Sequence, residues 1–135
     1  MKLECRPSIA TTWLVLGWFG VASVIYLSLT PSPPQLDLGR FTDKWEHLAA
    51  YGVLMLWFSQ LRIASGERMR VAICLVALGI ALEFAQHATG FRNFDIGDMV
   101  ADALGVCFGW LLAPPRLPNV LVLAGFATTE SPPAR

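Results

Sequence analysis

The chain has 135 residues, of which 55% are hydrophobic and 15% are charged, and its formal net charge at pH 7 is zero. A water-soluble domain of this size needs more polar surface than this composition supplies, which indicates an integral membrane protein. A chain with a pI near 6.7 has no basic field to attract a nucleic acid, so we expect no nucleic-acid partner.

Four apolar runs, taken in chain order, predict four helices. They comprise residues 9–30, 45–61, 71 to about 88 and about 98 to 113. Their lengths approach the range of about 17–25 residues that spans a bilayer. The first run lacks a clean signal-peptide cleavage site and is interpreted as a retained anchor. We therefore predict an all-α, polytopic membrane protein, a bundle of four transmembrane helices.

The basic residues predict the orientation of this bundle. With the N-terminus in the cytoplasm, seven of the ten Lys and Arg residues lie on the cytoplasmic side, as the positive-inside rule requires. The expected location is the bacterial inner (cytoplasmic) membrane, multi-pass, with both termini cytoplasmic. The expected organisation is a cytoplasmic N-terminus (1–8), a four-helix transmembrane domain (9–113, core motifs 43–109) and a Pro-rich cytoplasmic tail (114–135).

Ionisable residues gather at one level of three predicted helices. Helical spacing groups them as Asp43, His47 and Tyr51 on the second helix, Glu83, Gln86 and His87 on the third, and Asp98 and Asp102 on the fourth. Each intramembrane charge costs about 2.5–3.5 kcal/mol on insertion scales, and such residues usually mark a site. We predict that they turn toward one another and form a polar extracytoplasmic pocket.

Small residues indicate which faces pack closely. Gly105 and Gly109 share the face of Asp102, so this acidic face is expected to point into the bundle. A run of alanines at 77, 81 and 85 predicts a similar stripe on the third helix. Glu46 is expected to point away from His47 into the interface. Asp95 is expected to cap the N-terminus of the fourth helix.

Three segments resemble one known family. They are DKWEHLAAYGVL from Asp43, EFAQ from Glu83, and FRNFDIGDMVADALG from Phe91. Together these motifs resemble the VanZ-like membrane proteins. The resemblance implies a small bundle of membrane helices with a role in the cell envelope, since the family is named for members that lower susceptibility to teicoplanin. This chain has Asp102 where the family often has Asn.

The predicted pocket offers residues for catalysis and for binding. The catalytic candidates are His47, Glu83, Asp98 and Asp102, and the ligand-binding candidates are Asp43, Lys44, Tyr51, Gln86, His87 and Arg92. Imidazole and carboxylate groups suit a divalent metal, but their spacing matches no metal motif. We therefore expect no metal and no cofactor, and expect the acidic groups to pair with Lys44 and Arg92.

The expected partner is a membrane lipid or a lipid-linked envelope intermediate, whose phosphate Arg92 or Lys44 could bind. Whether the chain is an enzyme stays open. A histidine base in a carboxylate-rich pocket could hydrolyse a phosphoester, and the spacing of Arg92, Asp98 and Asp102 weakly echoes a motif of membrane phosphatases. Two alternatives are a small proton- or ion-coupled transporter and a non-catalytic membrane partner subunit whose glycine stripe forms the interface.

Overall fold

A computed structural model of the chain describes residues 2–32, 34, 42–62, 64–90 and 93–130. Its elements, in order, are β1 (Lys2–Cys5), α1 (Pro7–Leu29), α2 (Thr42–Ser59), α3 (Ser65–Thr89), α4 (Ile96–Leu112), α5 (Val120–Leu123) and β2 (Ala127–Glu130). The four long helices lie within a few residues of the four predicted runs. Apolar runs of this length therefore located the helices correctly.

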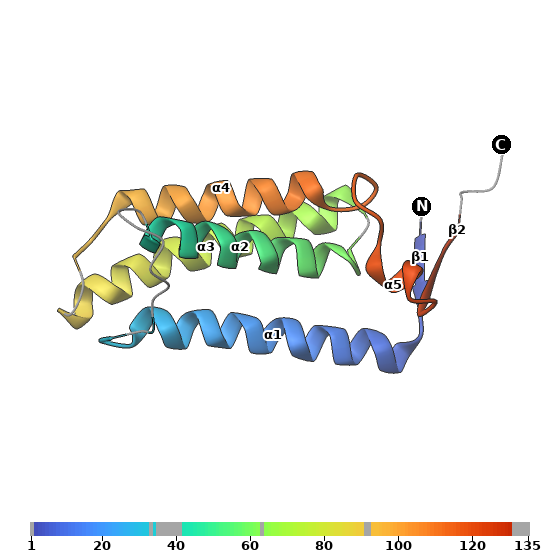
Figure 1. Ribbon diagram of the computed structural model, residues 1–135, viewed down its shortest axis with the longest axis horizontal. Helices are drawn as coiled ribbons and strands as arrows, with labels where there is room; N and C mark the ends of the chain where they lie inside the picture. Colours follow the sequence, from blue (N-terminus) through green and yellow to red (C-terminus); the bar gives the residue numbers. More distant parts are fainter. Residues whose placement is uncertain (1, 33, 35–41, 63, 91–92, 131–135) are drawn as a thin grey trace.

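The four long helices lie along one axis, and each runs in the direction opposite to the one before it (Figure 1). The helices α1 and α3 start at the end of the molecule that holds β1, β2 and α5, whereas α2 and α4 start at the opposite end. The first turns of α2 and α4 therefore lie at the same end as the last turns of α1 and α3. This arrangement gathers the predicted site residues at one end of the bundle.

The closest helix pair is α2 with α4, and glycines on both helices make it possible. A Cβ atom added to Gly105 would lie 2.3 Å from the carbonyl oxygen of Leu48, and one added to Gly109 would lie 2.3 Å from that of Gly52. No side chain fits in this space, so the two backbones are in direct contact. The predicted Gly105 and Gly109 stripe is confirmed, and its partner is α2 of the same chain.

The alanine stripe predicted on α3 does not form the expected contact. Ala77 and Ala81 are exposed, and the residue of α3 that meets α4 is Gly79. A Cβ atom at Gly79 would overlap the carboxylate of Asp102. The prediction failed because Gly79 lies between two of the alanines in sequence and faces a different side of the helix.

The middle of the bundle is apolar. Its buried cluster consists of Val21, Tyr51, Leu54, Met55, Phe58, Ala72, Leu75 and Val106. Next to this core, Trp13 of α1 stacks on Trp57 of α2 with ring centroids 3.8 Å apart. Each indole N–H of this pair donates to the backbone carbonyl of the other tryptophan at 3.0 Å, so the pair fixes α1 against α2.

The two ends of the described chain lie together. The strands β1 and β2 pair antiparallel, with Leu3 opposite Thr129. The short helix α5 precedes β2, and the side chain of Asn119 caps it while donating to the carbonyl of Gln60 at 2.7 Å. The predicted Pro-rich tail thus contains ordered elements. No local sequence pattern predicts the pairing of β1 with β2, because the two strands lie far apart in the sequence.

The prediction of four transmembrane helices is wrong. Among the described residues, two helices are long and apolar enough to cross a membrane, α1 and α3. The helix α4 has 17 residues, and α2 carries Asp43, Lys44 and Glu46 within its 18 residues. The predicted run began at Trp45 and therefore left out Asp43 and Lys44, which made this segment look more apolar than the helix α2 is. A two-stranded sheet also accompanies the helices.

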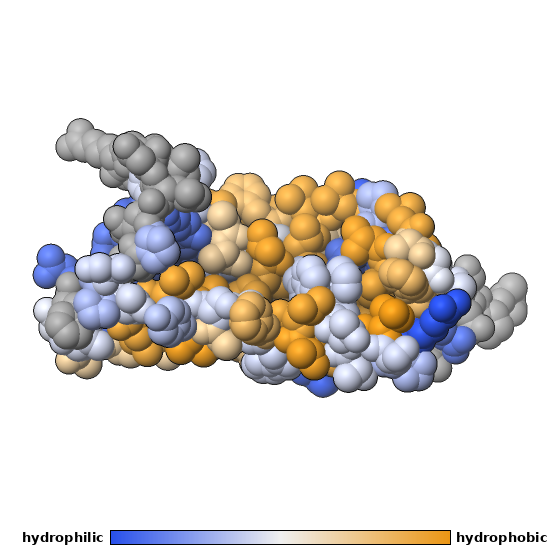
Figure 2. Space-filling model, turned by 60° about the horizontal axis from the view of Figure 1, so that its bottom comes forward, coloured by the Kyte–Doolittle hydropathy of each residue, from blue (hydrophilic) through white to orange (hydrophobic). Residues whose placement is uncertain are grey.

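Apolar side chains cover much of the outer surface. Only 11% of the apolar window of α1 is buried, and Trp18, Phe19 and Tyr26 are well exposed. Figure 2 shows hydrophobic residues over the middle of one face, with most of the strongly hydrophilic residues toward its two ends. An apolar surface of this extent indicates contact with lipid or with another protein.

Candidate functional site

A cluster of charged side chains joins the first turns of α2 and α4. Asp43 and His47 are four residues apart on α2, and Asp98 and Asp102 are four residues apart on α4, so each pair lies on one helix face. The glycine contact further along brings these two faces together. We call Asp43, Lys44, His47, Asp98 and Asp102 the acidic–histidine cluster.

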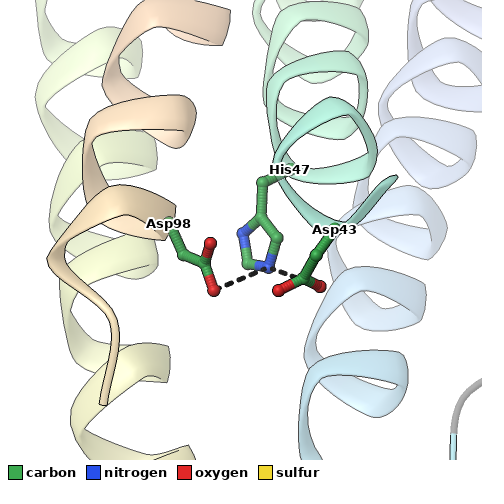
Figure 3. Close-up of side chains that lie close together, drawn as sticks. All are labelled: Asp43, His47 and Asp98. Carbon is green, nitrogen blue, oxygen red and sulfur yellow. Dashed lines mark ion pairs between the residues drawn. The ribbon is translucent and has the colours of Figure 1, made fainter. Parts of the chain in front are cut away.

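His47 is the centre of this cluster. Its Nδ1 lies 2.9 Å from Oδ1 of Asp102. Its Nε2 faces the other way, 3.9 Å from Oδ2 of Asp98 and 4.0 Å from Oδ1 of Asp43 (Figure 3). One ring nitrogen is therefore held by a buried carboxylate, and the other points between two further carboxylates.

Lys44 ties α2 to the start of α4. Its Nζ donates to Oδ2 of Asp95 at 2.6 Å and to Oδ1 of Asp98 at 2.8 Å. Asp95 also caps α4, because its Oδ1 accepts a hydrogen bond from the backbone N–H of Gly97 at 2.7 Å. The predicted N-cap role of Asp95 is confirmed. Lys44 thus neutralises two acidic groups at the helix N-terminus.

The surroundings of His47 favour its protonated form. Burial lowers the pKa of the imidazole, but the hydrogen bond to Asp102 and the negative charges of Asp102, Asp98 and Asp43 raise it by more. The net result is a pKa above the ordinary value of 6.5. The imidazolium therefore persists to higher pH than in a free histidine.

The acidic groups respond in opposite directions. Burial raises the pKa of Asp98, although the hydrogen bond from Lys44 and the charge of His47 oppose the rise. The hydrogen bond from Lys44 and the N–H of Gly97 lower the pKa of the exposed Asp95. Hydrogen bonds to Asp95 and Asp98 raise the pKa of Lys44 in turn. Asp98, which is buried, thus has a raised pKa beside the exposed Asp95, whose pKa is lowered.

Two predicted residues of α3 are buried near the cluster and have structural partners. Oε1 of Glu83 accepts a hydrogen bond from the backbone N–H of Asp95, which anchors the start of α4 to α3. Gln86 donates through Nε2 to the carbonyl of Ser28 at the end of α1, at 2.9 Å. Glu83 therefore reaches the cluster through Asp95, and its side chain does not meet His47.

A cleft of about 110 Å³ opens beside the cluster, between α1 and α2. Its polar lining comes from Ser28, Asp43, Glu46, His47 and Tyr51. The expectation that Glu46 points away from His47 is wrong, since both residues line this cleft. Tyr51 is 2% exposed and forms the inner wall. A ligand in the cleft would meet carboxylates, an imidazole, a phenol and a hydroxyl.

Two predicted residues do not join the cluster. The side chain of His87 is exposed, and its ring packs edge-on against Phe94 with centroids 6.0 Å apart. In the part of the chain that the structure describes, His87 makes no ion pair with the cluster. Arg92 lies outside the described residues.

Asp43, His47 and Asp98 offer one ligand atom each within 4.8 Å of one another, a separation compatible with a divalent cation. The ammonium group of Lys44 already occupies the carboxylate of Asp98 and would repel a cation there. The geometry therefore suits ion pairing between the helices better than metal coordination.

Sequence reasoning missed two glycines that complete the site. Gly52 lets α4 approach α2, and Gly79 leaves room for the carboxylate of Asp102 beside α3. A search of α3 for a small residue beside the buried Asp102 could have found Gly79. No such search would find Gly52, because its face of α2 carries no polar residue next to it.

The comparisons with known proteins name no family. No family model matches the chain, and no solved structure shows significant similarity to it. A protein of Stutzerimonas stutzeri (strain A1501) named N-(5'-phosphoribosyl)anthranilate isomerase is 27% identical over 125 residues, which are 93% of this chain and 55% of that protein. An uncharacterized protein of Schizosaccharomyces pombe (strain 972) is 31% identical over 103 residues, which are 73% of this chain and 61% of that protein. The chain thus spans little more than half the length of the curated relatives it matches.

Proposed function

We propose that this chain is a VanZ-like protein of the bacterial inner membrane and that its acidic–histidine cluster and cleft bind an envelope intermediate. The observation that carries the proposal is the meeting of the VanZ-like motifs in space. The first motif supplies Asp43, Lys44 and His47, and the third supplies Asp98 and Asp102. Glu83 of the second motif accepts a hydrogen bond from the backbone N–H of Asp95, the residue before α4. Residues from separate motifs thus converge on one cluster, and the cleft opens beside this cluster at Asp43 and His47.

The membrane location rests on α1 and α3, the two candidate spans. The helix ends that hold Arg6, Arg62, Arg68, Arg70 and Arg116 lie at the end of the bundle opposite the cluster. The pairing of β1 with β2 keeps both ends of the described chain at this basic end. By the positive-inside rule we assign the basic end and both termini to the cytoplasm, and the cleft to the extracytoplasmic side.

The chemistry of the cleft favours a glycan over a phosphate. Asp43 and Glu46 both line it, and a phosphate would meet their negative charges. The ammonium group of Lys44 is already engaged by Asp95 and Asp98. Carboxylates and a phenol bind sugar hydroxyl and amide groups well, so we assign the saccharide of a lipid-linked envelope intermediate to the cleft.

Binding has more support than hydrolysis. A general base must be unprotonated at the working pH, and the raised pKa of His47 favours the imidazolium, which cannot accept a proton. An imidazolium donates a hydrogen bond through Nε2, which suits a bound oxygen. The name of the Stutzerimonas stutzeri relative gives that protein an isomerase activity, and the described cluster and cleft favour binding in this chain.

Ion transport, an alternative from the sequence, has less support. The cluster occupies one end of the bundle, and in the described residues the buried core beyond Tyr51 is built from Leu54, Met55 and Phe58. A proton path would need polar groups or water along this core. A partner-subunit role through the glycine stripe also loses support, because Gly105 and Gly109 already pack on α2.

The test is native mass spectrometry of the gently solubilised protein, comparing the unchanged chain with Asp43→Asn and with the exposed control His87→Gln. We expect a retained lipid-linked saccharide on the unchanged chain and on His87→Gln, and its loss from Asp43→Asn. Expression in a glycopeptide-susceptible host should lower teicoplanin susceptibility for the same two proteins only. Equal retention by all three proteins would refute a role for the cleft.

A further inference from the structure

A second cavity lies outside the bundle, in the half away from the acidic–histidine cluster. It is a groove of about 680 Å³ between α3 and α4. Its lining includes Met69, Ile73 and Ala77 of α3 and Val106, Trp110 and Leu111 of α4. All of them are apolar or weakly polar, and no charged side chain lines the groove. A long apolar groove along a candidate span fits a hydrocarbon chain.

A cation lies at one end of this groove. Nη1 of Arg116 donates to the backbone carbonyl of Leu111 at 3.2 Å, and Leu111 itself lines the groove. The side chain of Arg116 is exposed, and its other guanidinium N–H groups have no partner among the described residues. Arg116 is also the one charged residue between positions 103 and 129. Between Asp102 and Glu130 the sequence therefore offers Arg116 no acidic neighbour.

These two features complement a molecule with an apolar chain and a negatively charged head. A guanidinium fork binds phosphate oxygens in two parallel hydrogen bonds, and it is weakly hydrated enough to do so at a membrane interface. The basic residues near this end, which include the exposed Arg70, add to the attraction for an anionic lipid.

We propose that the groove between α3 and α4 binds one acyl chain of an anionic phospholipid, with the phosphate on Arg116. The proposal rests on the membrane location of the chain and is independent of ligand binding in the cleft, since the two sites lie in opposite halves of the bundle. A lipid held there would seal this half of the seam between α3 and α4, where no backbone contact like that of Gly105 and Gly109 with α2 is found among the described residues.

Trp110 lines the groove and reports on its contents. The experiment measures quenching of tryptophan fluorescence in nanodiscs that contain phosphatidylglycerol or phosphatidylcholine with the same brominated chains. The difference between the unchanged chain and Trp110→Phe gives the contribution of Trp110. We expect the phosphatidylglycerol to reach half-maximal quenching at a mole fraction about fivefold lower, the preference that one basic residue near the surface provides.

Two pairs of variants separate the groove from general membrane contact. Arg116→Gln should abolish the preference for phosphatidylglycerol, whereas Arg6→Gln, at the same end but at the N-cap of α1, should keep it. Ala77→Phe fills the groove and should reduce Trp110 quenching by both lipids, whereas Ala22→Phe fills a separate apolar groove on α1 and should not. Circular dichroism confirms that each variant is folded.

Equal quenching by the two lipids, or a preference that survives Arg116→Gln, would overturn the proposal. Absence of Trp110 quenching by either lipid would also overturn it, and a concentration-dependent dimer in the same sample would then identify a second copy as the occupant. Loss of saccharide binding in the cleft, by contrast, would leave all of these readouts unchanged.

Discussion

His47 and Asp102 form the shortest contact between an imidazole and a carboxylate in the described bundle, with Nδ1 and Oδ1 2.9 Å apart. Asp102 is buried and lies against the backbone of α3 at Gly79, so its position is fixed by three helices. A fixed carboxylate orients the imidazole and keeps a proton on Nδ1, which leaves Nε2 to face Asp43 and Asp98. The geometry of the cluster therefore depends on Asp102 more than on any other residue.

Replacing Asp102 with Asn should preserve the fold and lower the pKa of His47. The amide oxygen can still accept the hydrogen bond from Nδ1, but the negative charge that favours the imidazolium is lost. The chain has two histidines, so NMR titration of the labelled imidazole carbons resolves His47, with His87→Gln as the assignment control. A pKa of His47 that stays the same in Asp102→Asn would contradict this account of the cluster.

Replacing Lys44 with Met should destabilise the bundle, because it leaves the buried carboxylate of Asp98 without its cation. The Lys44 side chain is 36% exposed, so solvent screening limits the expected loss to about 1–2 kcal/mol. Chemical unfolding in detergent measures this loss. The double variant with Asp98→Asn should lose less than the sum of the two single variants, since the two groups interact directly.

The matched control for Lys44 is Arg62→Gln. Arg62 and Glu67 form an exposed ion pair with atoms 3.7 Å apart, and such pairs contribute below about 0.5 kcal/mol. Two results would show that the ion pair of Lys44 with Asp98 does not stabilise the bundle. One is an equal loss of stability in Arg62→Gln and Lys44→Met. The other is a loss in the double variant equal to the sum of the losses in Lys44→Met and Asp98→Asn.

The glycine contact should be intolerant of a single methyl group. Gly105→Ala introduces a Cβ atom 2.3 Å from the carbonyl of Leu48, and overpacking of this kind costs about 1–3 kcal/mol. Gly66→Ala is the control, because Gly66 lies in α3 with no atom within 4 Å of an added Cβ. There alanine should leave stability unchanged or raise it by up to about 1 kcal/mol. Thermal unfolding compares the two, and equal stability would show that α2 and α4 can separate at no cost.

The sequence predicted the helices and much of the cluster because both signals are local. Apolar runs located four helices, and the spacing of Asp43 with His47 and of Asp98 with Asp102 correctly grouped each pair on one face. The partner of each face is a tertiary property. Hydropathy could not reveal that α4 packs closest to α2, because the deciding residue, Gly52, looks like any other glycine in an apolar helix.

Two failures have separate causes. The four-span prediction left out Asp43 and Lys44 at the start of α2 and accepted the 17 residues of α4 as a span, whereas α1 and α3 alone meet the requirement for a span in the described chain. The pairing of β1 with β2 could not be predicted either, because four-residue strands at opposite ends of the chain carry no periodic pattern long enough to recognise. Long-range pairing of short segments is decided by the folded bundle that brings them together.

Stability should fall as pH rises above the ordinary pKa of His47, near 6.5. The folded chain holds the imidazole proton more tightly than the unfolded chain, because Asp102, Asp98 and Asp43 surround it. The stabilisation is complete below the unfolded pKa and is lost as the pH rises through the higher folded pKa. Melting temperatures in detergent over a range of about pH 5.5 to 8.5 measure this decline.

Substitution separates His47 from other titrating groups. The pKa of Asp95 is lowered from 3.8, so the stability that Asp95 contributes is lost only in acid, below the pH range of the melting experiment. The ammonium group of Lys44 remains charged throughout that range. His47→Gln should therefore flatten the decline, whereas the exposed control His87→Gln should retain it. A decline that persists unchanged in His47→Gln would mean that another group binds the proton, such as Asp98, whose pKa is also raised.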